Sequence, residues 1–297
     1  MNRTLTLTRL SALTLLAALA VSCSKDVENV PVLATAPVSA DATATRDNNL
    51  ALGNPSGAVV DATNSPNNYL LTKSQYSLSY SRDKGKPNWV SWHLSSAWTG
   101  STPRQDNFAA DATLPSGWFR ATSSSYTGSG FDRGHNCPSA DRNASVADNS
   151  ATFLMTNMMP QSANNNQRTW AGLETYCRTL SDAGNELYII CGSYGTGGTG
   201  LNGYTTTIAS GKITVPSNCW KVVVVLPNGS GDASRITSAT RVIAINTPNN
   251  QTLATTWGSY RTTVDAIEAA TGYDILSAVP SSVQAVLEAS TDSGPTN

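Results

Sequence analysis

The chain has 297 residues, enough for one large domain or two small ones. Only 13% of the residues are charged and the formal net charge is −1, which excludes binding to a polyanion by overall attraction. Any recognition of phosphate must therefore come from a few local Arg or Lys side chains. With two histidines, a metal cage built from several of them is excluded as well. Only the extreme N-terminus is apolar enough to concern a membrane, which excludes a polytopic membrane protein.

Residues 1–22 are typical of a secretory signal peptide. Two arginines precede the apolar run Leu10–Val21, which is too short to remain as a membrane-spanning helix. Two cleavage sites compete. An Ala-x-Ala sequence at residues 18–20 fits an ordinary cut and a secreted product, whereas residues 20–23 resemble a bacterial lipobox, with Ala20 standing where Leu is commonest. We favour the lipobox because it gives Cys23 a use: lipidation there anchors an exported protein to the membrane, on the cell surface or facing the periplasm.

The composition changes near residue 67. Residues 23–66 carry the lipidated cysteine and are then rich in Ala, Thr, Asn and Pro without steady periodicity, which predicts a flexible tether. Residues 67–290 are predicted to form the folded domain. Residues 291–297 are predicted to be a disordered tail.

The folded part is predicted to mix strands and helices. Alternating or continuous apolar runs predict strands at residues 76–80, 89–94, 186–191, 219–226 and 241–246. Helical spacing appears at residues 167–181, 263–271 and 280–289. Because the two types do not alternate regularly, the order favours an α+β domain with a largely antiparallel central sheet flanked by helices.

Four cysteines remain in the body of the chain: Cys137, Cys177, Cys191 and Cys219. An even number in an exported protein predicts two disulfides, and the absence of a C-x-x-C spacing argues against zinc. Four cysteines allow three pairings, among which the spacing does not choose.

The richest polar stretch is Phe131–Arg142, which contains His135. Alone, a histidine beside Asp-Arg pairs is ordinarily structural. Downstream, however, an Asn-rich segment opens an apparent helix on which Asn166 and Glu174 lie eight residues apart. In an α-helix this offset is about 12 Å along the axis and about 80° around it, so both side chains can face one concave site.

The string Asp132-Arg133-Gly134-His135, followed by Asn166 and Glu174 at this spacing, resembles the DNA/RNA non-specific endonuclease family. This family is part of the ββα-metal, or His-Me finger, superfamily, and the resemblance extends from about residue 76 to residue 287. It implies a ββα-metal nuclease fold, hydrolysis of phosphodiester bonds in DNA and RNA, and Mg²⁺ as the cofactor with Mn²⁺ as the alternative.

The resemblance also implies roles for individual side chains. His135 would be the general base and Asn166 the single direct protein ligand of Mg²⁺, which suits a hard ion that keeps most of its waters. Glu174 would orient those waters, one of which protonates the leaving 3′-oxygen and so leaves 5′-phosphate ends. Arg133 would bind the phosphate through its planar fork of donors.

The resemblance also assigns roles to three further residues, which match the family pattern less directly. Arg104 is matched to an upstream arginine that acts in catalysis and substrate binding. Asn157 is matched to a supporting or substrate-contacting asparagine, while Phe153 occupies a place where the family has a polar residue. Arg142 is expected either to touch backbone phosphates or to form a salt bridge with a nearby aspartate.

Other residues near these motifs are predicted to have structural roles. His93 and Trp170 are predicted to be core residues. Cys137 and Cys177 closely follow the proposed base and the proposed carboxylate, so their pairing is favoured if those groups share one site. The other two cysteines would then join two strands.

The sequence therefore predicts an exported, Mg²⁺-dependent endonuclease with little sequence preference; it indicates no protein partner and leaves open whether an inhibitor exists. A competing hypothesis is a cell-surface lipoprotein that binds glycans or proteins without catalysis, through its Trp, Tyr and Asn-rich loops. That alternative does not explain the spacing of the histidine, asparagine and glutamate. The sequence leaves the oligomeric state open.

Overall fold

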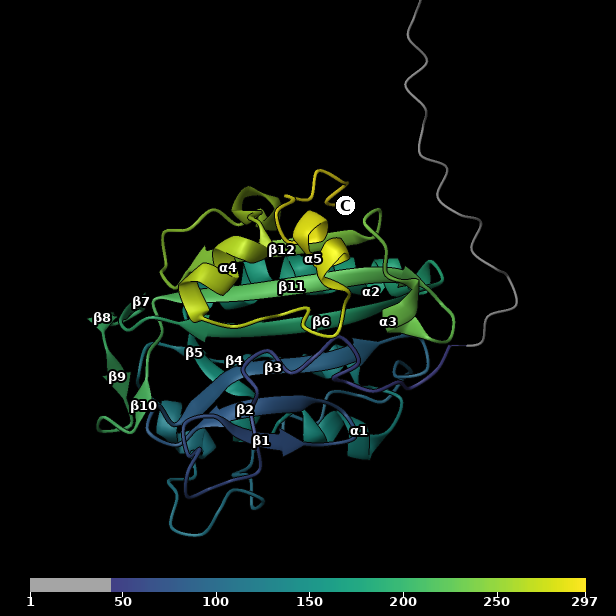
Figure 1. The fold of residues 1–297 in the computed structure, drawn as a ribbon. Coiled ribbons are helices and arrows are strands. Elements are labelled where there is room, and N and C mark those ends of the chain that lie inside the picture. The colour runs from purple at the N-terminus through teal and green to yellow at the C-terminus, as the bar shows by residue number, and fades with distance from the viewer. Residues whose placement is uncertain (1–43) are drawn as a thin grey trace, which may run out of the picture. The chain divides into compact units, whose positions relative to one another are not determined.

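An antiparallel six-stranded sheet organises the part of the chain that the computed structural model describes, residues 44–297 (Figure 1). The predicted signal peptide and Cys23 lie outside the described residues. The strand order is β1-β2-β3-β6-β11-β12, and every neighbouring pair is antiparallel. The strands are β1 (Tyr69–Thr72), β2 (Ser77–Ser81), β3 (Lys86–Leu94), β6 (Asn185–Tyr194), β11 (Asn218–Pro227) and β12 (Arg241–Pro248). The predicted α+β class is confirmed.

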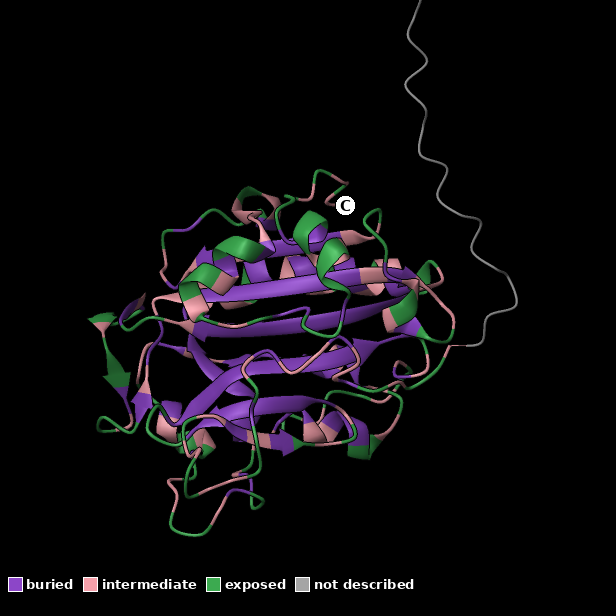
Figure 2. Cartoon of the chain, viewed as in Figure 1, coloured by how far each residue is buried: buried purple, intermediate pink, exposed green. Residues whose placement is uncertain are grey.

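The sheet is covered on both faces because its side chains alternate with the period of two of a strand. On β6, Leu187 and Ile189 belong to one apolar cluster, and Tyr188 and Ile190 belong to another. The first face is covered by helix α2 (Ala171–Asp182), which contributes buried apolar side chains to the first cluster. The second face is covered by helices α4 (Val264–Thr271) and α5 (Ser281–Leu287), whose outer sides are exposed (Figure 2).

Shorter elements connect these layers. Three two-stranded ribbons are formed by β4 (Asp132–His135) with β5 (Met158–Gln161), β7 (Gly198–Gly200) with β8 (Gly203–Thr205), and β9 (Thr207–Ile208) with β10 (Ile213–Thr214). The short helices are η1 (Ser123–Tyr126), η2 (Ser139–Asp141), α1 (Val146–Ala151), η3 (Met155–Asn157), η4 (Asn165–Trp170), α3 (Asp232–Arg235) and η5 (Trp257–Tyr260). Within residues 44–297, no helix combines the length and the apolar character needed to cross a bilayer.

The fold begins earlier than the boundary predicted at residue 67. Leu52 and Ala58 are each 2% exposed and join the apolar cluster on the second face of the sheet. The backbone carbonyls of Leu52 and Pro55 accept hydrogen bonds from Ala278 and Asp274. Residues 44–66 are therefore part of the domain and not tether, because sparse apolar side chains in a polar segment find partners on a distant sheet face.

The C-terminal residues also pack against the domain. The carboxylate of Asp292 is 4% exposed and forms ion pairs with Arg241 at 2.8 Å and with Arg261 at 3.2 Å. The backbone carbonyl of Gly294 accepts a further hydrogen bond from Arg261. The predicted disordered tail at residues 291–297 is wrong, because one buried carboxylate tied to two guanidinium groups orders it.

The four body cysteines are free thiols, all of them buried. The pairing of β6 with β11 sets Cys219 opposite Ser193, and Cys191 opposite Lys221, so the two strand cysteines do not face each other. Burial raises the pKa of Cys137, Cys177 and Cys219 to about 12. The predicted disulfides Cys137–Cys177 and Cys191–Cys219 are therefore wrong: the thiols serve as small apolar groups in the core.

Candidate active site

The β4–β5 ribbon carries the motif that includes His135. A Cβ atom at Gly134 would lie 2.3 Å from Oε1 and 2.7 Å from Cβ of Gln161, so only glycine lets the two strands approach this closely. Asn157, which precedes β5, is fully buried and ties down the chain just after the motif. Its side chain accepts from the Cys137 amide at 3.0 Å and donates to the carbonyls of Cys137 at 2.8 Å and Thr152 at 2.9 Å. Of the two roles predicted for Asn157, substrate contact does not fit, because its side-chain polar atoms are used inside the fold; these hydrogen bonds are those of a supporting residue.

The ring of His135 lies between two aromatic side chains. Its centroid is 5.1 Å from that of Phe153 at an interplanar angle of 87°, and 5.7 Å from that of Phe108 at 58°. His135 is 9% exposed, and its Nε2 atom is buried without a hydrogen-bond partner among the described residues. Burial, reinforced by the positive charges of Arg104 and Arg133, lowers the pKa of His135 to about 3. The imidazole is therefore neutral at neutral pH and keeps a lone pair for a proton.

The two arginines lie against the same two aromatic rings. The guanidinium carbon of Arg104 is 4.8 Å from the ring centroid of Phe153, and that of Arg133 is 4.3 Å from the ring centroid of Phe108. Arg104 also donates to Asp106 at 2.7 Å and to the hydroxyl of Ser139 at 2.8 Å.

Arg133 is held in a similar way, because its Nη1 donates to the hydroxyl of Ser123 at 2.5 Å. The structure thus brings Arg104, Arg133 and His135 together through shared aromatic neighbours. Because the Arg104 side chain is 49% exposed, its positive charge is open to an incoming anion.

Asn166 is joined to the motif through Asp132, the first residue of β4. Its Nδ2 donates to Oδ2 of Asp132 at 2.8 Å, and Nε2 of Gln167 donates to the same oxygen at 2.9 Å. A carboxylate can only accept here, so the bond fixes which end of the Asn166 amide faces Asp132. The carbonyl oxygen of Asn166 is left as a hard, neutral donor of the type that Mg²⁺ takes. These residues fit the metal that the sequence implies.

The helix that carries Asn166 is not α-helical at that residue, although residues 163–164 before it are. Element η4 is a π-helical segment, and α2 continues directly from it. Because π-helical hydrogen bonds span five residues instead of four, the rotation expected between Asn166 and Glu174 from α-helical geometry does not apply. Such π turns are rare and are frequent at functional sites. Trp170, which ends the segment, is 1% exposed and lies in the core as predicted.

Glu174 lies on α2 in a largely buried ion pair. Its carboxylate is 15% exposed and 3.6 Å from Nζ of Lys221, a strand residue that is itself 1% exposed. The Lys221 ammonium lies 4.1 Å from the ring centroid of Trp170. Burial raises the pKa of Glu174, an effect that the charge of Lys221 partly offsets. No direct hydrogen bond joins this carboxylate to Asn166, so any joint action of the two must pass through an intervening group.

Arg142 has no part in this surface. Its side chain is fully buried and donates to three carbonyl groups, those of Gln75 at 2.8 Å, Asp141 at 2.7 Å and His93 at 2.8 Å. Neither predicted alternative holds, since Arg142 reaches no open surface and forms no ion pair. Backbone carbonyls, which sequence patterns do not reveal, hold the guanidinium in place.

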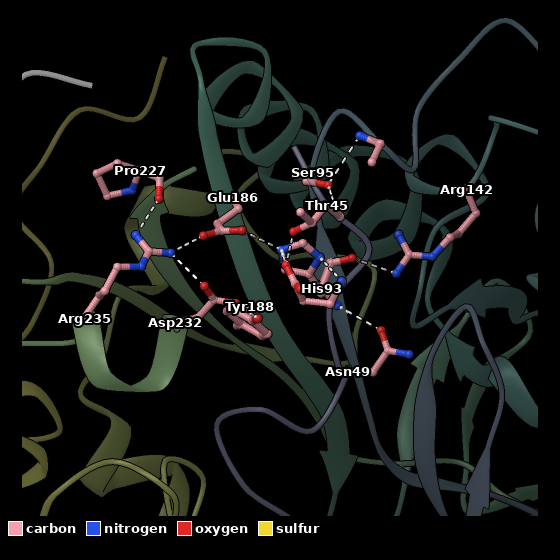
Figure 3. Close-up of polar contacts among 12 residues, drawn as sticks. Thr45, Asn49, His93, Ser95, Arg142, Glu186, Tyr188, Pro227, Asp232 and Arg235 are labelled. Atoms are coloured by element: carbon pink, nitrogen blue, oxygen red, sulfur yellow. Dashed lines mark hydrogen bonds and ion pairs between the residues drawn. The ribbon is translucent and has the colours of Figure 1, made fainter. Parts of the chain in front are cut away.

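His93 belongs to a separate buried network on β3 and β6 (Figure 3). Its Nδ1 accepts from the backbone N–H of Asp47 at 3.3 Å, so Nε2 carries the proton and donates to Glu186 at 3.1 Å. Arg235 then bonds both Glu186 and Asp232. Although Asp47, His93 and Glu186 are close enough to hold a metal ion, the ring offers no lone pair to one in this arrangement. His93 is structural, as predicted.

Comparison with known proteins decides the family. The family model described as DNA/RNA non-specific endonuclease matches residues 55–282. The chain belongs to the DNA/RNA non-specific endonuclease family. As a member of this family it is a nuclease, a hydrolase of phosphodiester bonds. It is 48% identical over 277 residues to a nuclease of Nostoc sp., covering 93% of this chain and 96% of that protein.

Two further proteins are similar to this chain at lower sequence identity and over a smaller share of its length. Nuclease C1 of Cunninghamella echinulata is 36% identical over 54% of this chain and 66% of its own length. A chain in the crystal structure of the EndoG/EndoGI complex superposes with a TM-score of 0.63 at 22% identity, covering 78% of this chain and 91% of that one. That superposition shows that the DNA/RNA non-specific endonuclease shares its fold.

Sequence reasoning missed the residues that position the site. Asp132 was visible in the motif, but its bond to Asn166 joins positions 34 residues apart and leaves no local signal. The sequence does not single out Phe108, and it marks Phe153 only as a departure from the family pattern. The apolar character of both residues predicts burial, without indicating that they pack against His135.

Proposed function

We propose that this nuclease cleaves DNA and RNA with little sequence preference, using one Mg²⁺ ion and His135 as the general base. The observation that carries the proposal is the neutral ring of His135, whose buried Nε2 has no hydrogen-bond partner and whose two aromatic neighbours also hold Arg104 and Arg133. A lone pair beside two positive charges is suited to take a proton from a water that attacks a bound phosphate.

The low pKa of His135 suits a general base only if bound substrate raises that pKa. An imidazole whose pKa is about 3 is a weak base, and the charges of Arg104 and Arg133 help to keep it so. A phosphate anion bound by these guanidinium groups offsets their charge, which raises the basicity of the ring when substrate is present. The base therefore becomes effective in the complex, where the attacking water is also in place.

Metal binding would rest on Asn166, whose carbonyl oxygen is left free by the bond of its Nδ2 to Asp132. A bound Mg²⁺ would supply positive charge to the phosphate oxygens and acidify a water for the leaving 3′-oxygen. Glu174 would hold waters around the site from a second layer, with Lys221 as the countercharge that keeps it ionised. We expect 5′-phosphate and 3′-hydroxyl ends.

The lack of base and sugar preference follows from the groups available. Arg104 and Arg133 recognise phosphate, which carries no sequence information. The net charge of −1 supplies no general attraction to nucleic acid, so affinity depends on these local contacts. Such weak overall attraction suits an enzyme that must release its fragments.

The test is cleavage of plasmid DNA and of RNA by the purified chain, with Mg²⁺ or with EDTA. We expect His135→Ala to lose at least about a hundredfold in rate, the usual contribution of a positioned base. His93→Ala is the matched control for replacing a buried histidine outside the site. Cleavage that persists at the wild-type rate in EDTA, or in the His135 variant, would remove the mechanism.

We also propose that the protein is exported and anchored through a lipid on Cys23. The support is the basic and apolar leader followed by a lipobox-like sequence. Metabolic labelling with a fatty-acid analogue should mark the wild type and leave Cys23→Ser unmarked. Label on both proteins would reject lipidation at this residue.

A further inference from the structure

Three carboxylates meet where helix α4 contacts the end of α5. Asp265 and Glu268 lie on α4, and Glu288 is the residue that caps α5. One oxygen from each lies within 4.8 Å of the others. In the described part of the chain, no Lys or Arg forms an ion pair with any of the three. Three like charges are thus held together without a countercharge from the protein.

Glu288 is the member that points to a ligand. It is 7% exposed, and its Oε1 is buried without a hydrogen-bond partner. Two nearby backbone amides already donate to other acceptors. The Asp265 amide donates to the Glu288 carbonyl at 3.0 Å, and the Ile275 amide donates to Oε1 of Glu268 at 2.7 Å. An unpartnered buried carboxylate facing two others costs stability unless a cation or a proton joins them.

Another buried carboxylate of this chain, in contrast, has a partner for each of its oxygens. Glu186, 1% exposed, has His93 on one oxygen and Arg235 on the other. Those partners complete its charge and hydrogen bonding within the protein. The contrast shows that Glu288 lacks what a buried carboxylate receives elsewhere in this fold.

We propose that Asp265, Glu268 and Glu288 bind one divalent cation of the Ca²⁺ class, which clamps α4 to the end of α5. An all-oxygen set of carboxylates suits a hard cation, and Ca²⁺ tolerates the irregular geometry of a site shared by two helices better than Mg²⁺ does. Softer metals prefer nitrogen or sulfur ligands, which the cluster lacks.

The site is separate from the candidate active site. Both helices pack on the face of the sheet opposite α2, through buried residues such as Ile267 and Leu287. Glu288 also lies beyond residue 282, where the family match ends. The cation would therefore stabilise the fold and take no part in catalysis.

The test is thermal unfolding of the EDTA-treated chain at pH 8, with and without 10 mM CaCl₂ (an amount chosen at roughly 100 times the Kd of a modest extracellular site). We expect Ca²⁺ to raise Tm by roughly 5 °C in the wild type. Asn166→Ala, which removes the ligand proposed for the active site, should keep the full shift. Glu288→Gln, an isosteric change, should lose it, and calorimetric titration should find one Ca²⁺ bound to Asn166→Ala.

Three outcomes would overturn the proposal. They are no rise in the wild type, an equal rise in Glu288→Gln, and an equal rise with NaCl at matched ionic strength. If Glu288→Gln fails to fold, the exposed Asp265→Asn serves in its place and must likewise lose the shift. A cluster that shares a proton instead would respond to pH and not to Ca²⁺, which also rejects the site.

Discussion

The side-chain amide of Asn166 donates a hydrogen bond of 2.8 Å to the carboxylate of Asp132. This contact joins the first residue of β4 to the π-helical segment η4 that leads into α2. It orients the amide so that its oxygen, and not its NH₂ group, is available to a metal ion. The ribbon and the helix are thereby linked at the point where the proposed base and the proposed metal ligand must cooperate.

Asp132→Asn should weaken metal binding without unfolding the chain. An amide at position 132 no longer requires Asn166 to present its NH₂ group, so the ligand oxygen is less often free. We expect the Mg²⁺ concentration for half-maximal cleavage to rise about 10- to 100-fold. Asp83→Asn is the matched control, because Asp83 accepts a similar bond of 2.7 Å from Asn67 on the exposed surface. An unchanged Mg²⁺ requirement in Asp132→Asn would contradict the orienting role.

The pH dependence of kcat/KM should report the low pKa of His135. A general base acts when deprotonated, and burial together with Arg104 and Arg133 lowers this pKa to about 3. We therefore expect no loss of kcat/KM from His135 between pH 8 and pH 5. Arg104→Gln removes one positive charge and should move the acid limb to higher pH, in addition to slowing cleavage. Arg82→Gln, which breaks an exposed pair with Asp83, should leave the limb in place; a common shift in both variants would argue against the mechanism.

Phe153→Leu should slow cleavage more than its effect on stability predicts. The change removes the edge-to-face contact with His135 and the surface on which Arg104 lies. Since small displacements of catalytic groups cost much in rate, we expect kcat to fall roughly tenfold. Tyr69→Leu removes a buried ring on β1, away from these contacts, and should lower Tm with little change in kcat. Equal losses of kcat in the two variants would show that Phe153 only fills space.

The buried thiols should be unreactive in the native protein. Burial raises the pKa of Cys137, Cys177 and Cys219 to about 12 and raises the pKa of Cys191 well above its ordinary value, so the reactive thiolate is scarce. In a Cys23→Ser chain, a thiol reagent should find no reactive groups under native conditions and all four after denaturation without reductant. Fewer than four under denaturing conditions would reveal disulfides and contradict the free thiols.

Stability without divalent cations should decrease as pH rises toward neutrality. Burial, with the charges of Glu268, Asp274 and Asp265, raises the pKa of Glu288 to about 7 from an ordinary value of 4.5. The folded state then binds this proton more tightly than the unfolded state, so its contribution is complete below about pH 4.5 and is lost through pH 7. In EDTA, Tm should fall more between pH 5 and pH 8 in the wild type than in Glu288→Gln. Parallel curves would show that Glu288 is not the responsible group.

The residue pattern alone was enough for the fold class and for the family. The continuous apolar runs of β6 and β11, which a sheet covered on both faces requires, and the helical spacing before Gly272 are properties of residues that are neighbours in sequence. The string around His135 and its distance to Asn166 are likewise fixed along the chain. These features were predictable because each depends on residues close in sequence or on a spacing that can be counted.

Tertiary structure alone decided which polar side chains remain available for chemistry. Arg142 and Asn157 are residue types suited to bind substrate, but their side chains donate hydrogen bonds to backbone carbonyl groups from elsewhere in the chain. Conversely, the packing of Phe153 on His135 and the partnerless state of Glu288 arise only when distant segments meet. Hydrogen-bond partners and desolvation depend on those long-range neighbours, which no local pattern encodes.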